Sequence, residues 1–462
     1  MIEQFDTIVI GAGISGETCA HRLRMAGMRV ALVEREYIGG ECAFWASIPT
    51  DSLLGPANAR WRARVLAGID SPAVASPRSL TPSEILLSSL DETAQIESIE
   101  KEGGVFIRGD AQFIARDQIT VDGRQLQAPH IVVATGSESS IPEIPGLAES
   151  GYWTNREAAT AEAVPQSVVV LGGEGHAVEI GQMFRLYGAE VTLITRESRL
   201  LVDEDPAIGK LLAQRLRQQG IRVVVGHIAT RIGSDEDHAC VVTLDDGTEL
   251  HAQALVVATR RDPRICGLQL EKAGVRYNAS GIIVDETCRA AEGVWAVGAV
   301  TGGLGHLSHA AQYQARIAAD DILGQPHPAH YDSVPRVYYT IPQIAATGWT
   351  KSQTNNHRPH HIVSVAVELR ERKKVPTSAH RPEQGKLTLF ADTRRQTLVG
   401  AWAIATEASD WIQLAVLAIR AQVPLQELRD TLEQFPPFGE TYLSAVDQLI
   451  VEVAQRKVPV KR

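Results

Sequence analysis

Short apolar runs followed by glycine-rich turns organise the first part of the chain. Residues 5–10 (FDTIVI) form such a run, and GAGISG at 11–16 and a helical stretch that stops near Gly27 follow it. A second apolar run at 29–33 ends at Glu34. Short apolar runs bounded by glycine are typical of buried parallel strands. The pattern therefore predicts a strand–helix–strand unit.

The same order of apolar run, glycines and helix returns near residue 170. The run at 168–171 leads into GGEGHA at 172–177, and a later run at 190–195 ends at Thr195. Strands that alternate with helical patterns predict parallel sheets covered by helices. We therefore expect an α/β fold with two Rossmann-like nucleotide-binding domains.

The first of these units carries a complete dinucleotide-binding fingerprint. Gly11 makes the tight turn, Gly13 lets the backbone approach a pyrophosphate, and Gly16 lets the helix pack closely on the strand. The helix start offers free N–H groups to the phosphates. Glu34, at the end of the second strand, is placed to accept hydrogen bonds from ribose hydroxyls. We predict a bound dinucleotide here.

Composition narrows the class of protein. The 462 residues allow roughly three domains, and 44% hydrophobic and 22% charged residues are ordinary for a soluble globular chain. The formal net charge of −10 argues against a nucleic-acid partner, and we read the basic run at 370–374 as a solvated loop. No apolar run reaches about 18 residues, and the chain enters a strand almost at once, so we expect neither a membrane span nor a signal peptide. The scattered, odd-numbered cysteines suit a reducing cytoplasm; they are Cys19, Cys42, Cys240, Cys266 and Cys288.

Residues 39–51 (GGECAFWASIPTD) resemble the redox-active segment of the flavin-dependent disulfide reductases, in which two cysteines lie on a helix beside FAD. Further segments extend the resemblance over nearly the whole chain, to the pyridine nucleotide-disulfide oxidoreductase family that includes mercuric reductase and dihydrolipoamide dehydrogenase. These segments are ATG at 134–136, IPEIPG at 141–146, GVWAVG at 293–298, HAAQYQ at 309–314, and the stretch from 385 to 401.

The resemblance implies a domain organisation and partners. FAD would be bound by a discontinuous domain made of residues 1–150 and 279–333, and a degenerate NAD-binding domain would occupy residues 151–278. Residues 334–462 would form an α+β dimerisation domain that pairs two chains. We therefore expect a homodimer that binds FAD and a small-molecule substrate, without a metal. The residues predicted to bind FAD are Gly11, Gly13, Gly16, Glu34, Cys42, Ser47, Ala134, Thr135, Gly136, Gly298 and Ala299.

Departures from the family pattern fall on the chemistry. Ser47 stands where the second cysteine belongs, and a hydroxyl cannot take part in thiol–disulfide exchange. Ala299 replaces the acid that holds the ribitol, which would cost about 1–3 kcal/mol of binding. Asp51 matches the family's lysine near the flavin, and Glu179 matches the glutamate that pairs with it. Two close carboxylates resist joint ionisation, so they would form a coupled acid–base pair; alternatively, Asp51 faces solvent and caps a helix.

Other candidate catalytic groups follow from the same alignment. The family's acid–base histidine is replaced by Phe435, while its orienting acid is kept as Glu440. Phe435 either lines an apolar pocket or packs at the dimer interface. His309 matches a position near the flavin, where it acts on protons or makes a structural contact. Cys42 is either a nucleophile or a small packing residue. His306 has no family counterpart and is a further candidate, or a loop residue.

The second glycine loop looks unfit for a nicotinamide dinucleotide. Aligned on Glu179, Glu174 occupies the position of the second glycine and Ala177 that of the third. A carboxylate at the second position blocks and repels a pyrophosphate, and Thr195 replaces the ribose-binding acid. Arg260 stands where a glycine is expected. We therefore expect poor use of NADH and NADPH.

These departures led us to expect a flavoprotein that has lost disulfide chemistry. We predict an FAD-dependent oxidase or dehydrogenase that oxidises a small organic substrate, with oxygen as acceptor, in specialised biosynthesis. The catalytic candidates are Asp51, Glu179, Cys42, His309 and Glu440. Two alternatives stay open: a residual NAD(P)H-dependent flavin reductase, and a non-catalytic FAD-binding or interaction protein.

Overall fold

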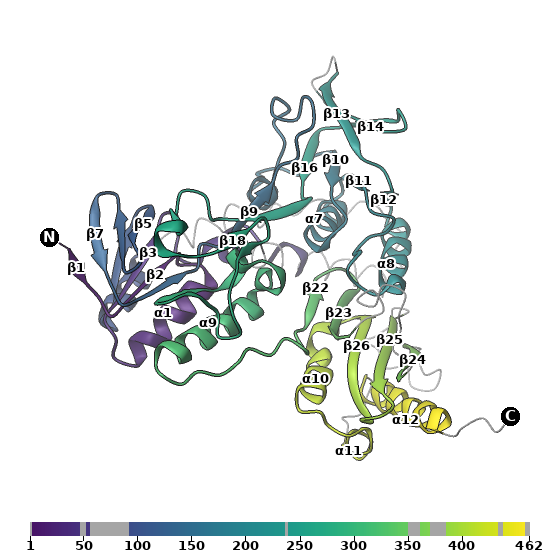
Figure 1. The fold of residues 1–462 in the computed structure, drawn as a ribbon. Helices are drawn as coiled ribbons and strands as arrows, with labels where there is room; N and C mark the ends of the chain where they lie inside the picture. Colours follow the sequence, from purple (N-terminus) through teal and green to yellow (C-terminus); the bar gives the residue numbers. More distant parts are fainter. Residues whose placement is uncertain are drawn as a thin grey trace.

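The structure is a computed structural model in which three lobes meet at the centre of the molecule (Figure 1). It describes residues 2–46, 52–55, 92–235, 239–349, 361–369, 385–432 and 438–457.

The first lobe is built on a six-stranded sheet with the order β20-β21-β8-β2-β3-β4. Its central strand, β2 (Thr7–Ile10), is buried along its whole length and pairs in parallel with β3 and β8. The predicted strand at residues 5–10 begins only at Thr7, because the Phe5 backbone N–H donates to the Gln127 carbonyl oxygen outside this sheet. The other strands of the sheet are β3 (Val30–Glu34), β4 (Val105–Arg108), β8 (His130–Val133), β20 (Arg289–Ala291) and β21 (Val294–Ala296).

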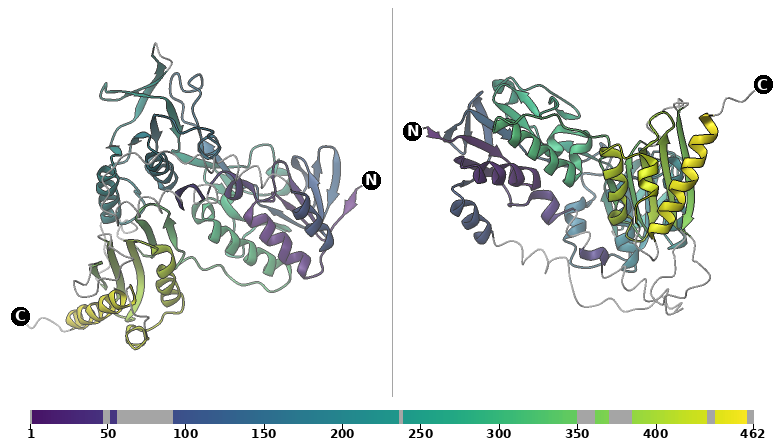
Figure 2. Two further views of the ribbon diagram at one scale, coloured as in Figure 1. Left: turned by 180° about the vertical axis from the view of Figure 1, so that it is seen from behind. Right: turned by 90° about the horizontal axis from the view of Figure 1, so that it is seen from below.

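Two helices lie side by side on this sheet, although they are far apart in the sequence. They are α1 (Ile14–Met25) and α9 (Ser308–Ile322), and Figure 2 shows them packed together. A ligand in an open parallel sheet binds beyond the strand ends, where neighbouring strands lead in opposite directions. Here that point lies between β2 and β8, and α1 begins beside it. The smaller elements of the lobe are α2 (Gly40–Phe44), α5 (Thr93–Lys101), β1 (Glu3–Gln4), β5 (Ala111–Ala115), β6 (Gln118–Val121), β7 (Arg124–Gln127), β18 (Tyr277–Asn278), β19 (Gly281–Ile282), η1 (Leu270–Ala273), η2 (Gly298–Thr301) and η3 (Gly303–His306).

The middle lobe repeats this plan with a four-stranded parallel sheet of order β12-β11-β10-β16. Its helix α7 (Gly175–Leu186) packs on the sheet through buried apolar side chains. A two-stranded ribbon made by β9 (Ser137–Ser140) and β17 (Arg260–Pro263) joins the middle lobe to the first. The remaining elements are α6 (Asn155–Ala159), α8 (Pro206–Gln218), β10 (Ser167–Leu171), β11 (Glu190–Thr195), β12 (Arg222–Val225), β13 (Ala229–Ser234), β14 (Cys240–Leu244), β15 (Glu249–Ala252) and β16 (Ala254–Val257).

The C-terminal lobe is a five-stranded antiparallel sheet of order β22-β23-β26-β25-β24, with helices on one face (Figure 2). Apolar side chains of the sheet and helices, such as Leu389 and Val446, form its core. The elements are β22 (Arg336–Tyr338), β23 (Gln343–Gly348), β24 (Ile362–Leu369), β25 (Gly385–Asp392), β26 (Thr397–Ala405), α10 (Ala408–Arg420), α11 (Leu425–Arg429) and α12 (Phe438–Lys457). The predicted fold class, two Rossmann-like domains and an α+β domain, is confirmed.

No helix in the described ranges is both long enough and apolar enough to cross a membrane.

Candidate functional site

The first glycine loop runs from β2 into α1 in the geometry that its sequence predicts. Gly11 has a positive φ of 100°, and a side chain there would meet the Ala134 carbonyl oxygen at 2.4 Å. A side chain at Gly16 would lie 1.8 Å from the Gly11 carbonyl oxygen, so only glycine lets the helix approach the strand. Gly13 differs, because a Cβ there would meet nothing within 4 Å. That open space at the start of α1 is where a pyrophosphate would lie.

Two carboxylates stand beside this loop. Glu34 accepts hydrogen bonds from the Ala12 and Glu36 backbone N–H groups, at 2.7 and 2.8 Å, and lines the cavity. Its carboxylate keeps lone pairs for a ribose. Burial raises the pKa of Glu17, in the first turn of α1, to about 7; Arg24 opposes the rise and Glu34 adds to it. Glu17 therefore carries only part of a negative charge near the phosphate site.

A cavity of about 430 Å³ extends from the first glycine loop to Cys42. Ala134, Thr135, Gly136 and Ala299 also line this cavity. Gly298 lies just behind Ala299, where its backbone N–H donates to the buried Gln314 side chain at 2.8 Å. The loop, the open space at the helix start and the ribose acid all fit FAD. The described residues predicted to bind FAD are therefore brought together, while Ser47 lies outside the described residues.

Cys42 lies on α2, which begins directly beside the first glycine loop. Gly39, before the helix, donates its N–H to the Ala12 carbonyl oxygen at 2.8 Å. The Cys42 sulfur is 3.2 Å from the Ser308 hydroxyl oxygen at the start of α9. All five cysteines are free thiols, and Cys42 is half-buried. Cys42 also lines a second, wider cavity of about 1360 Å³.

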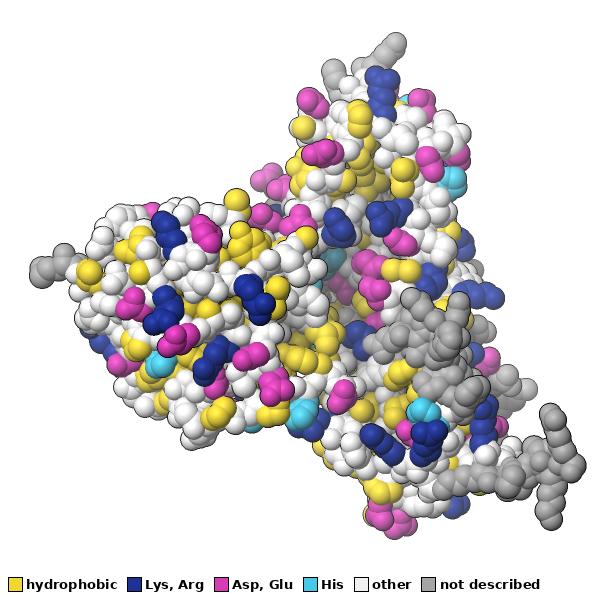
Figure 3. Space-filling model, viewed as in Figure 1, with side chains coloured by type: hydrophobic (Ala, Val, Ile, Leu, Met, Phe, Trp, Pro, Cys, Tyr) yellow, Lys and Arg dark blue, Asp and Glu magenta, His cyan; other side chains and the backbone are white. Residues whose placement is uncertain are grey.

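That second cavity lies where the three lobes meet, and Figure 3 shows basic, acidic and histidine side chains around the hollow between them. It contains Cys42, Glu179 and His309, which sequence alignment had selected as catalytic. The Glu179 carboxylate accepts the Tyr339 backbone N–H at 2.8 Å and lies 3.7 Å from the His176 ring. Asp51, and with it the predicted Asp51–Glu179 pair, lies outside the described residues.

The remaining catalytic candidates are His309, His306, Phe435 and Glu440, and the structure describes the surroundings of the two histidines. The His309 ring Nε2 donates to the Pro335 carbonyl oxygen at 2.6 Å, and burial lowers its pKa although this bond acts in the opposite direction. Burial, and then the nearby Arg261, lowers the pKa of His306. Phe435 lies outside the described residues. Glu440 falls on α12, but its side chain is likewise outside what the structure describes.

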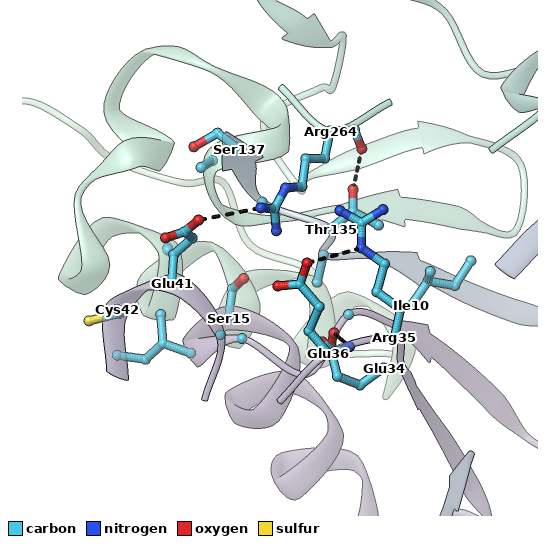
Figure 4. A pocket seen from close by; sticks show the side chains of 18 of the residues that line it. Ile10, Ser15, Glu34, Arg35, Glu36, Glu41, Cys42, Thr135, Ser137 and Arg264 are labelled. Atoms are coloured by element: carbon cyan, nitrogen blue, oxygen red, sulfur yellow. Dashed lines mark hydrogen bonds and ion pairs between the residues drawn. The ribbon is translucent and has the colours of Figure 1, made fainter. Parts of the chain in front are cut away.

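A cluster of charged side chains supports α2 and was not predicted; Figure 4 shows Glu36, Glu41 and Arg264 of this cluster. Glu41, the residue before Cys42, is 2.9 Å from Arg156, 3.3 Å from Arg264 and 3.6 Å from Arg261. Arg156 also binds Glu36 at 2.8 Å. Burial alone would lower the pKa of Arg156, but these two glutamates raise it above its ordinary value. The only sign of this cluster in the sequence is the arginine-rich stretch at 260–264, of which the sequence analysis considers Arg260 alone.

The second glycine loop differs from the first at the position that should be open. Glu174 precedes α7, and its pKa is raised to about 6 by burial and then by Asp203, against a hydrogen bond from the Val202 backbone N–H. Gly175 is the first residue of α7, and the Tyr338 ring packs on it so closely that a Cβ would lie 2.5 Å away. Thr195 is buried against Gly173. A carboxyl group and an aromatic ring therefore narrow the place where a second pyrophosphate would enter. Because the Glu174 carboxyl is neutral below about pH 6, they weaken the binding of a nicotinamide dinucleotide rather than exclude it.

Comparison with known proteins gives relatives along nearly the full length. A mercuric reductase from Staphylococcus aureus is 30% identical over 446 residues, which cover 94% of this chain and 81% of that protein. One from Acidithiobacillus ferrooxidans is 30% identical over 464 residues, covering 97% and 82%. One from Streptomyces lividans is 29% identical over 469 residues, covering 98% and 97%.

Solved structures agree with this similarity. The HOCl-induced flavoprotein disulfide reductase RclA from Escherichia coli, in its Cu(II) complex, is 25% identical with a TM-score of 0.83, covering 97% of this chain and 100% of that chain. LpdA from Mycobacterium tuberculosis is 21% identical with a TM-score of 0.84, covering 97% and 100%, and shows a shared fold.

These similarities contradict the predicted oxidase. We had expected a flavoprotein that passes electrons to oxygen and does not reduce disulfides or mercuric ion. The similar proteins are instead mercuric reductases and a flavoprotein disulfide reductase. The prediction failed because it treated the loss of one sulfur, at Ser47, as the loss of all thiol chemistry, whereas Cys42 remains in the cavity.

Two family models match this chain. Residues 5–315 match pyridine nucleotide-disulphide oxidoreductases, and residues 334–446 match the dimerisation domain of the same family. The family and these relatives confirm the predicted FAD, and the second match supports a homodimer. The chain belongs to the pyridine nucleotide-disulphide oxidoreductase family and is an FAD-dependent oxidoreductase.

Proposed function

We propose that this chain is a reductase that takes electrons from a reduced pyridine nucleotide and passes them, through FAD and Cys42, to a disulfide substrate. The position of Cys42 carries the proposal. Its side chain lines both the cavity that fits FAD and the wider cavity beside the second glycine loop. The names of the similar proteins, mercuric reductases and a disulfide reductase, support reduction as the direction of the chemistry.

A single cysteine is sufficient for this reaction if the substrate supplies the other sulfur. The Cys42 thiolate attacks one sulfur of the substrate R–S–S–R, which forms Cys42–S–S–R and releases R–S⁻. FAD, when bound, supplies the two-electron exchange between the nicotinamide and this mixed disulfide. Reduction of the mixed disulfide restores the Cys42 thiolate and releases the second R–S⁻. The whole reaction consumes one reduced nucleotide and one proton for each disulfide and yields two thiols.

His306 is the group we assign to the proton. It lines both cavities together with Cys42. The family resemblance, in contrast, implies that Phe435, which carries no proton, stands at the position of the family's histidine. Because burial lowers its pKa, the imidazole is neutral near pH 7 and accepts a proton from the thiol. His309 is less suitable, because one ring nitrogen is already bonded to Pro335.

A disulfide is favoured over a soft metal ion as the substrate. A mixed disulfide needs one protein sulfur, and the sequence offers Cys42 without a second cysteine at position 47. The relatives named mercuric reductases make Hg(II) the comparison substrate.

Anaerobic stopped-flow reduction tests the donor, and steady-state turnover tests the acceptor. NADH or NADPH should bleach the flavin, and a low-molecular-weight disulfide such as glutathione disulfide or cystine should restore its colour with thiol release. Cys42→Ser should bleach but lose turnover by at least about 100-fold, because no thiolate remains. Cys240→Ser, which changes a buried thiol in the distant β14, is the control. Turnover by Cys42→Ser at the wild-type rate, or no reoxidation by any disulfide, would contradict the proposal.

A further inference from the structure

The sulfur of Cys42 has a hydroxyl neighbour that neither the sequence nor the family resemblance singled out. Cys42 Sγ and Ser308 Oγ are 3.2 Å apart, although 266 positions separate the two residues. Both line the cavity whose residues fit FAD and the second cavity. This contact therefore lies at the junction of the two spaces, where an electron donor and a substrate sulfur would meet.

Ser308 is held firmly by its surroundings. It is the first residue of α9, a helix of 15 residues. The next residue, His309, is tied to the Pro335 carbonyl oxygen at 2.6 Å, and the Ala311 N–H closes the first turn on Leu307 at 2.8 Å. The start of α9 also carries the positive end of the helix dipole and free N–H groups. The Ser308 hydroxyl is thus held at an electropositive point, within hydrogen-bond distance of the Cys42 sulfur.

We propose that Ser308 is a positioning residue that donates a hydrogen bond to the Cys42 thiolate and holds it as the nucleophile. This inference rests on the proposed function, in which Cys42 attacks the substrate disulfide. A hydroxyl suits the role because its hydrogen bond stabilises the thiolate, while it cannot form a covalent bond to the sulfur. A cysteine in the same place would tie up the nucleophile in a disulfide between α2 and α9.

Other charged groups around Cys42 must be separated from this effect. His306 on η3, His176 on α7 and Arg261 on β17 line both cavities with Cys42. Glu41, the neighbouring residue on α2, is neutralised by three arginine side chains. Glu179 faces the second cavity. Substitution of Ser308 leaves all of these charges unchanged, so a change in thiol reactivity in that variant reports the hydroxyl alone.

The test is the rate of Cys42 alkylation by iodoacetamide against pH, followed by mass spectrometry in the FAD-bound dimer. Ser308→Ala should slow alkylation at pH 7 by about tenfold and move the midpoint of the pH profile up by about one pH unit. Ser308→Thr, which keeps the hydroxyl, should restore the wild-type profile. Cys266, the exposed thiol of the same chain, is the internal control, and Ser139→Ala is the matched control, because Ser139 lines the second cavity but bonds Asn155.

A second variant tests the contact without depending on the first. Ser308→Cys should form a disulfide with Cys42 under mild oxidation, because the side-chain atoms at these two positions are already 3.2 Å apart and an S–S bond is about 2.05 Å long. Two thiols should disappear from the titration and return with dithiothreitol. This result keeps the proposal testable if Ser308→Ala fails to fold.

Wild-type alkylation in Ser308→Ala, or slow alkylation in both the alanine and the threonine variants, would overturn the inference. Persistence of both free thiols in Ser308→Cys would overturn it as well. Alkylation needs neither nucleotide nor disulfide, so these results stand apart from the turnover assay. If Ser308→Ala slows alkylation as expected but the wild-type protein reduces no disulfide, the proposed function is wrong and the role of Ser308 toward Cys42 still holds.

Discussion

Removal of the Glu41 charge should destabilise the protein, and the structure fixes the size of the effect. Three guanidinium groups surround this carboxylate at 2.9–3.6 Å, and the exposed fractions of the four side chains lie between 16% and 29%. Breaking a buried ion pair by removing one partner costs about 3–5 kcal/mol, because the remaining charge stays uncompensated. Arg156 would keep its ion pair with Glu36. We therefore expect Glu41→Gln to lower the free energy of unfolding by about 3 kcal/mol, the lower end of this range.

The assay is thermal and urea unfolding of the FAD-bound protein. About 3 kcal/mol corresponds to a fall in Tm of about 3 °C for a chain of 462 residues. Glu138→Gln is the control, because its side chain is 54% exposed and its 3.4 Å pair with Arg264 should contribute less than about 1 kcal/mol. Adding Arg261→Gln to Glu41→Gln should recover part of the loss by removing one uncompensated cation. Equal stability of Glu41→Gln and the wild type would show that water already screens the cluster.

Three further predictions concern the nucleotides and the carboxylate pair. Gly13→Glu should give a folded but colourless protein, because Gly13 has an ordinary φ of −72° and the side chain would fill the open phosphate space; full flavin content in the purified variant would refute this. Glu174 has a pKa of about 6, so its carboxyl is neutral below that pH and repels phosphate above it. NADPH binding measured by titration should therefore weaken as the pH rises from 5 to 8. Glu174→Gln should remove that dependence and bind NADPH about tenfold more tightly than the wild type at pH 8. A flat wild-type profile would place the nucleotide away from Glu174. If Asp51 and Glu179 share a proton, Asp51→Asn or Glu179→Gln should change the pH profile of flavin reduction, and unchanged profiles in both variants would exclude the pair.

The local parts of the site could be predicted from the sequence, because they depend on neighbouring residues. Gly11, Gly13 and Gly16 lie within one turn, and Glu34 ends the next strand, so their spacing alone determines the loop geometry. The predicted order of strands and helices followed for the same reason. The bounds shifted by a residue or two, as at the start of the run at residues 5–10, where the Phe5 N–H bonds to the distant Gln127.

The supports of Cys42 could not be predicted in this way. Ser308 reaches the sulfur from 266 positions away, and Arg261 reaches Glu41 from the ribbon that joins two lobes. Neither residue belongs to a spacing pattern, since the contacts depend on how α9 and β17 fold back onto α2. Long-range contacts of this kind leave only a weak trace in composition, here a group of arginines.

The error about function has a chemical cause that the structure makes clear. We reasoned that a hydroxyl at position 47 cannot exchange with a disulfide, which is correct for Ser47 itself. The further step, that thiol chemistry was lost, assumed that both sulfurs must come from the protein. In the proposed function, a substrate disulfide brings its own sulfur to Cys42, so the missing cysteine at position 47 removes the internal disulfide and leaves the nucleophile. The proposed role of Ser308 follows the same argument, because a hydroxyl 3.2 Å from the Cys42 sulfur cannot form a disulfide with it and would leave Cys42 free to attack.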